Sequence, residues 1–141
     1  MALLQHARVG AFRGLVQRMT GRSFRVCVVA DWDAWSAWLK AVPTAEGENP
    51  HDARVRHIEA TGETILQYQG DWGFSWICPG CGMASGGDLG DTPVSGWDKP
   101  QWVNSGSHKR PTLTPSLGCP TWRRGDCPGH WWLRDGSLVP A

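Results

Sequence analysis

Apolar residues near the start of the chain recur at spacings of three and four positions. This spacing places them on one side of an α-helix, and Gly21 is suited to end that helix. The same stretch carries several arginines and no acidic residue before Asp31, so the predicted helix is amphipathic and basic. Its apolar positions are Leu4, Ala7, Ala11 and Leu15.

A second pattern, rich in β-branched residues, follows at residues 24–30. Its composition and short length predict a mostly buried strand. After it, Asp31 or Asp33 can cap a helix in which tryptophans recur every three residues and therefore share one face. We expect this face either to pack into the core or to bind a partner. Its members are Trp32, Trp35 and Trp38.

Polar residues with two prolines and a glycine predict an exposed loop over residues 43–53. Beyond this loop, apolar and polar positions alternate over Arg54–Ala60 and again over Glu63–Tyr68, with a Thr-Gly pair between them. This alternation predicts a β-hairpin. A third strand is predicted over Trp72–Ile77.

The chain changes character from Cys78 onward, because glycine and proline become frequent. The whole sequence holds 18 glycines and 10 prolines among 141 residues, which predicts turns and short strands rather than long helices. Short strand candidates lie near Trp102, near Leu113 and over His130–Leu133. The Asp-Gly pair at 135–136 predicts a hairpin turn after the last of these strands.

These elements predict an α+β fold with two N-terminal helices, a small antiparallel sheet and a loop-rich β C-terminal half. We expect residues 1–70 to form a helix and strand extension and residues 71–141 to form a zinc-binding β region, the two making one compact unit. Because the second half is poor in regular elements, we expect a disulfide or a metal ion to stabilise it.

Five cysteines are present, and four of them lie in this second half. Cys78 and Cys81 flank a Pro-Gly turn, a spacing that directs both thiolates to one centre. Cys127 and His130 repeat the spacing, so the predicted site holds Zn²⁺ with three thiolates and one imidazole. Cys119 in place of His130 would give an all-thiolate site, and this alternative stays open. The fifth cysteine is expected to be buried in the first strand.

Three motifs of this half resemble a family of small proteins common in bacteriophage genomes. They are the Cys-Pro-Gly-Cys knuckle at 78–81, the Pro-Thr-Leu-Thr-Pro-Ser segment at 111–116, and the Cys-Pro-Gly-His pair at 127–130 before an Arg-Asp-Gly hairpin. The similarity covers residues 72–138, and family members often bear the name ammonia monooxygenase, which nothing in this sequence supports. The resemblance implies a zinc group of Cys78, Cys81, Cys127 and His130.

Charge and hydropathy restrict the class of function. The formal net charge is +1, which is low for a dedicated nucleic-acid binder. Because the chain has no long apolar run and no secretory signal, we expect a protein of the host cytoplasm or the virion, with no membrane partner. The favoured hypothesis is a non-enzymatic, phage-type zinc module that binds another protein of the virion or host. Its expected partner-binding residues are Trp32, Trp35, Trp38, Arg123 and Arg124.

Two other functions stay open. A zinc hydrolase would need an open coordination position and a carboxylate base, for which Asp126 or Asp98 is available. His130 could also form a nucleophilic pair with Cys119. A nucleic-acid-binding zinc protein would use the basic residues at 109–110 and 123–124 together with exposed tryptophans. The proline-bounded segment at 111–117 is expected to be a scaffold strand rather than part of an active site.

Overall fold

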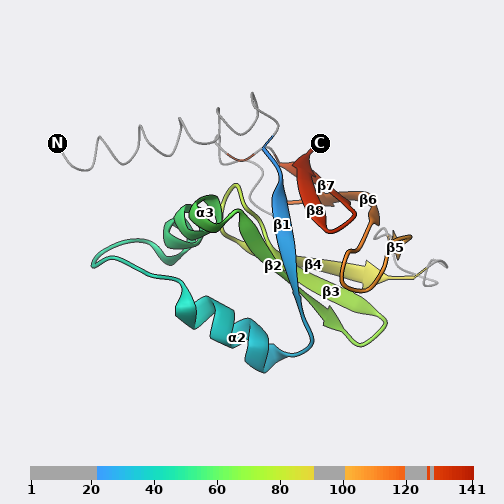
Figure 1. Ribbon diagram of the computed structural model, residues 1–141, viewed down its shortest axis with the longest axis horizontal. Coiled ribbons are helices and arrows are strands. Elements are labelled where there is room, and N and C mark those ends of the chain that lie inside the picture. Colours follow the sequence, from blue (N-terminus) through green and yellow to red (C-terminus); the bar gives the residue numbers. More distant parts are fainter. Residues whose placement is uncertain (1–21, 91–100, 120–126, 128) are drawn as a thin grey trace.

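The computed structural model describes residues 22–90, 101–119, 127 and 129–141. The eight strands of these residues form one closed barrel in chain order, and the last strand pairs back with the first (Figure 1). The elements are β1 (Phe24–Val29), α2 (Trp32–Ala41), α3 (Pro50–Thr61), β2 (Glu63–Gln69), β3 (Gly73–Ile77), β4 (Ala84–Leu89), β5 (Gln101–Asn104), β6 (Leu113–Gly118), β7 (His130–Arg134) and β8 (Ser137–Pro140).

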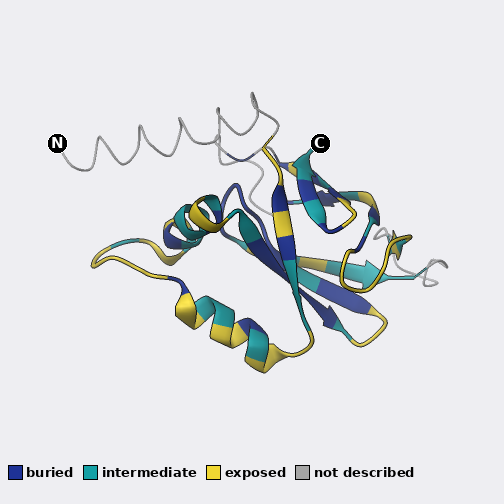
Figure 2. Cartoon of the chain, in the orientation of Figure 1, coloured by how far each residue is buried: buried dark blue, intermediate teal, exposed yellow. Residues whose placement is uncertain are grey.

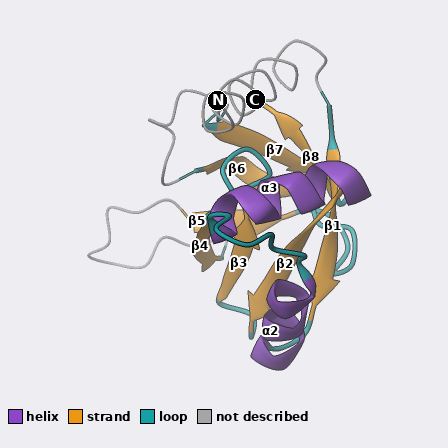
Figure 3. Ribbon diagram, turned by 90° about the vertical axis from the view of Figure 1, so that its left-hand side faces the viewer, coloured by secondary structure: helices purple, strands orange, loops and turns teal. Residues whose placement is uncertain are grey.

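The two helices connect β1 to β2. These strands are parallel, and a parallel pair needs a long crossover connection, which α2 and α3 supply. Asp31 caps α2, because its carboxylate accepts a hydrogen bond from the amide of Ala34 at 2.8 Å. Both helices contact β2 and cover one side of the barrel (Figure 3).

Residues 54–60 are helical and do not form the predicted strand. They belong to α3, where Asn49 caps the first turn and Pro50 occupies the first helical position. Gly62 ends this helix in the left-handed conformation, with φ of +72°. The hairpin prediction was wrong because Gly62 is a helix cap rather than a turn residue, and the helix start lay in the segment expected to be a loop.

The predicted α+β arrangement with a small antiparallel sheet is also wrong. β1 pairs with β8, and β2 pairs with β3. Strands from both halves of the chain therefore share one closed sheet. The glycine-rich residues 84–89, where no strand was predicted, form β4. Glycine suits this strand because a Cβ on Gly86 would lie 2.5 Å from the carbonyl oxygen of Phe74 on β3.

Large apolar side chains fill the core. Phe24 of β1 meets Trp131 of β7 edge to face, with ring centroids 5.9 Å apart, and both side chains are fully buried. Figure 2 shows the buried residues concentrated on the strands, whereas the outward side of α2 is exposed. Other fully buried side chains are Trp76, Phe74, Ile58, Ile65, Leu66, Ile77, Leu113, Leu117, Leu133 and Leu138.

Several predicted elements are confirmed. Strands are present at 24–29, 73–77 and 130–134, and the tryptophan-rich helix begins at Trp32. The Asp-Gly pair at 135–136 has positive φ at both residues and joins β7 to β8. The predicted N-terminal helix lies outside the described residues. Neither helix of the described ranges has the length and apolar character that crossing a membrane requires.

Candidate functional site

Four buried cysteines gather in the structure: Cys78, Cys81, Cys119 and Cys127. Their sulfur atoms all lie within 4.8 Å of one another, with 3.6 Å between Cys78 and Cys127 and 2.9 Å between Cys81 and Cys119. A disulfide bond measures about 2.05 Å, so neither pair is bonded. Two thiolates bound tetrahedrally at about 2.3 Å from Zn²⁺ would stand about 3.8 Å apart. The 3.6 Å separation agrees with this value and the 2.9 Å separation is shorter, and the four clustered sulfur donors could hold a single metal ion.

The first two cysteines lie on a tight turn between β3 and β4. The amide of Gly82 donates a hydrogen bond to the carbonyl oxygen of Cys78 at 2.8 Å, and Gly82 has φ of +72°. A Cβ on Gly82 would lie 2.1 Å from the carbonyl oxygen of His51, so α3 packs directly against this turn. Arg54 of the same helix donates to the carbonyl oxygen of Gly82 at 3.2 Å. The helix thus orients the turn that carries both sulfurs.

The other two cysteines flank β6 and β7. Cys119 directly follows β6, and Cys127 precedes β7 by three residues. Hydrogen bonding with Cys119 and then with Cys127 raises the pKa of the Cys78 thiol, and burial adds to this effect. Cys119 likewise raises the pKa of Cys127. Four buried thiols this close together remain protonated unless a cation compensates the charge of the thiolates.

His130 is not one of these four residues. Its exposed side chain lies on β7, and Nδ1 stands 3.5 Å from the hydroxyl oxygen of Ser116 on β6. The structure therefore favours the all-thiolate alternative over the set that included His130. When Nε2 carries the proton of the neutral ring, Nδ1 can accept the hydroxyl proton of Ser116. A serine hydroxyl facing an imidazole in this way has the arrangement of a nucleophile and its general base.

Ser116 lies in an irregular part of β6. Leu113 and Leu117 each have a partner on β7, but the three residues of β6 between them stand opposite a single residue. Such a bulge removes residues from the regular ladder and re-aims a side chain. Ser116 precedes Gly118 by two residues, and Gly118 is in register with His130, so the pairing of the two strands brings serine and histidine together.

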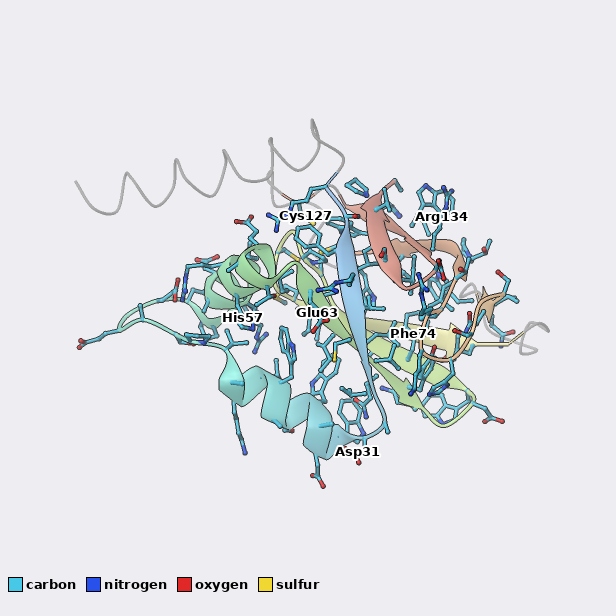
Figure 4. The ribbon with its side chains drawn as sticks, viewed as in Figure 1. Asp31, His57, Glu63, Phe74, Cys127 and Arg134 are labelled. Carbon is cyan, nitrogen blue, oxygen red and sulfur yellow. The ribbon has the colours of Figure 1, made fainter. Side chains whose placement is uncertain are left out.

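The other predicted binding residues lie elsewhere. On α2, Trp35 is buried, Trp38 packs against His57 with ring centroids 5.7 Å apart, and Trp32 is 54% exposed. This helix face is therefore divided between core and solvent. In Figure 4 the cluster residue Cys127 lies in the upper part of the view and Asp31, at the start of α2, lies at the bottom. Outside the described residues are Asp98, Arg123, Arg124 and Asp126.

Residues 49–141 match a protein family described as "Bacterial ubiquitination-like system serine protease (BubE)". The match covers more than half of the chain, and it contains all four clustered cysteines as well as Ser116 and His130. No curated protein and no solved structure matches the chain.

The family match contradicts the expected non-enzymatic binding module, because its description names a protease. Ser116 was not among the predicted site residues, because the prolines around it indicated a scaffold strand. The predicted nucleophilic partner of His130 was Cys119, whose sulfur lies in the buried cluster. The available signal was a serine hydroxyl on the short strand predicted near Leu113.

Proposed function

The chain belongs to the BubE family of serine proteases, and we propose that it cleaves amide bonds with Ser116 as nucleophile and His130 as general base. The contact of 3.5 Å between Oγ of Ser116 and Nδ1 of His130 carries this proposal. The distance is long for a hydrogen bond, and contacts of this kind shorten when substrate binds. Ser116 is half-buried and His130 exposed, so a substrate can reach both side chains.

The reaction proceeds by acyl transfer. Nδ1 of His130 takes the proton of the Ser116 hydroxyl while Oγ bonds to the carbonyl carbon of the substrate. The carbon–nitrogen bond then breaks, and His130 returns its proton to the departing amine. Water next attacks the acyl-serine, giving a proton to His130. The ester bond breaks, a carboxylic acid leaves, and Ser116 regains its proton from His130.

The family description supports a substrate class as well as a reaction. The description names a ubiquitination-like system. Ubiquitination itself joins a small protein through its C-terminal carboxyl group to an amine, and the amide bond formed is one that an acyl-serine mechanism breaks. The proposed substrate is therefore a ubiquitin-like protein joined through its C-terminus. A panel of such fusions, incubated with the protein and analysed by mass spectrometry, identifies the bond that is cleaved.

The four-cysteine cluster is proposed to hold Zn²⁺ in a structural role. Four thiolates complete the tetrahedral coordination that Zn²⁺ prefers, and such a site supplies folding free energy. It would join the turn at Cys78 and Cys81 to the ends of β6 and β7. One zinc ion per chain in protein purified without added metal, with four sulfur ligands by X-ray absorption, tests this role.

Labelling with a fluorophosphonate probe, which bonds covalently to activated serines, tests the nucleophile. We expect labelling on Ser116 in the native chain and none in Ser116→Ala. The matched control is Ser36→Ala, because Ser36 is an exposed serine on α2. Ser36→Ala should be labelled as the native chain is. Equal labelling of Ser116→Ala would show that another residue is the nucleophile.

A further inference from the structure

Ser116 follows a proline at which the pairing of β6 with β5 stops. The last register pair joins Val103 to Thr114, and the next would join Trp102 to Pro115. Proline has no amide hydrogen and cannot continue the ladder as a donor. The backbone that leads into Ser116 therefore loses its regular partner strand at this point.

The side chain of Trp102 replaces the lost pairing. Its indole Nε1 donates a hydrogen bond to the carbonyl oxygen of Ser116 at 3.3 Å. A partly buried carbonyl without a partner would be costly, so this bond gives the oxygen a partner beyond the point where the pairing of β6 with β5 ends. It also fixes the peptide group that follows the serine.

Neighbouring residues hold the indole ring in place. The ring meets Phe74 edge to face, with centroids 5.6 Å apart. It also lies over Gly87 of β4, where a Cβ would be 2.5 Å from Cζ3 of Trp102. Any larger residue at this position would displace the ring. The amide of Gly90 donates to the carbonyl oxygen of Trp102 at 3.0 Å and anchors its backbone.

We propose that Trp102 is a positioning residue that fixes the backbone at Ser116 so that the hydroxyl stays within reach of His130. This inference rests on the proposed role of Ser116 as nucleophile. Trp102 binds the carbonyl and not the hydroxyl of the serine, so it acts through Ser116. Because nucleophilic attack depends steeply on placement, losing this one neutral hydrogen bond should slow acylation about threefold to tenfold.

The experiment replaces one atom group. β-(3-Benzothienyl)alanine at position 102 keeps the shape of tryptophan but has sulfur where the indole carries N–H. The same replacement of Trp72, which is 61% exposed, is the matched control. Gly87→Ala, which displaces the ring by the clash described above, is a second and independent variant. Intact-mass spectrometry measures the rate constant and the final extent of fluorophosphonate labelling over a range of pH.

A slower rate constant with complete final labelling is expected for the analogue at 102 and for Gly87→Ala. The pH midpoint should not change, because the base is untouched, and the analogue at 72 should match the native chain. A native rate constant for the analogue at 102 would overturn the proposal. So would incomplete labelling at a native rate constant, which indicates only a loss of folded protein. Labelling of Ser116→Ala would instead refute the proposed nucleophile, so the two failures are distinguishable.

Discussion

The amide of Cys119 donates a hydrogen bond to the carbonyl oxygen of Gly129 at 2.8 Å. Cys119 belongs to the four-sulfur cluster, and Gly129 directly precedes His130. Ser116 lies three residues before Cys119 on the same stretch of chain. The ends of β6 and β7 therefore carry both the cluster and the serine–histidine pair, and disorder in one is expected to spread to the other.

Cys119→Ser is expected to reduce bound zinc, lower the thermal midpoint by about 10 °C, and slow the labelling of Ser116. The reason is that the metal would lose one of its four thiolate ligands. The ends of β6 and β7 would then no longer be joined through coordination of the same ion. Metal analysis, thermal unfolding and probe labelling on the same sample measure the three effects. Cys27→Ser is the control, since Cys27 lies outside the cluster. Full zinc content and a native midpoint in Cys119→Ser would contradict this prediction.

Gly82→Ala should be more destabilising than Gly47→Ala. Both glycines have φ near +75°, so both variants strain the backbone, at a cost of about 1 kcal/mol. Only Gly82 also has a close neighbour, the carbonyl oxygen of His51, whereas nothing lies within 4 Å of a Cβ on Gly47. We expect Gly82→Ala to cost about 3 kcal/mol in the free energy of unfolding, measured with urea. Equal losses would show that α3 moves freely away from the turn.

His130→Gln should slow labelling of Ser116 by about 100-fold to 10,000-fold, because general-base assistance is lost. The fold should persist, since the side chain is exposed, and circular dichroism checks this. His57→Gln is the matched control, because His57 lies on α3 against Trp38 and does not contact Ser116. A native labelling rate in His130→Gln would exclude His130 as the base.

Tyr68 should make stability depend on pH in the alkaline range. It is the single tyrosine of the chain, and its hydroxyl donates to the carbonyl oxygen of His108 at 2.8 Å. Burial raises the pKa of Tyr68 above its ordinary value of 10.0. The group therefore contributes stability that is complete below pH 10.0 and lost as the pH rises through the higher pKa of the folded state.

Ultraviolet absorbance of tyrosinate measures this titration without interference from other tyrosines. We expect a higher midpoint in the native chain than in urea. Tyr68→Phe should weaken the fall of unfolding free energy above pH 10.0. Coincident midpoints in the folded and unfolded protein would contradict the prediction.

Local patterns predicted local structure. Asp31 marked the start of α2 because capping depends on residues within one turn, and Cys78 with Cys81 lie side by side because the turn between them is short. The clustering of cysteines in this half of the chain could therefore be anticipated. The choice between Cys119 and His130 could not, since both spacings are compatible with a ligand and only the register of β6 with β7 decides which side chain is buried.

The closed barrel depends on pairings between distant residues, which no short pattern reports. Phe24 of β1 lies opposite Leu138 of β8, and this pairing closes the ring. The role of Gly62 was equally hidden, because a glycine between two alternating segments is compatible with a hairpin turn and with a helix end. Ser116 was missed because the prolines around it predict an extended scaffold segment, and its neighbour His130 is brought close only by strand pairing.

A sheet that closes on itself has no free edge strand, and this restricts how a polypeptide can dock. Partners of many sheet proteins extend an open edge through main-chain hydrogen bonds, a mode that the ring from β1 to β8 does not offer within the residues that the structure describes. The C-terminal tail of the proposed substrate would instead be bound by side chains and by the backbone groups that the bulge at Ser116 leaves outside the regular ladder. Selectivity is then expected to follow from the chemistry of the last few residues of that tail more than from its ability to become a strand.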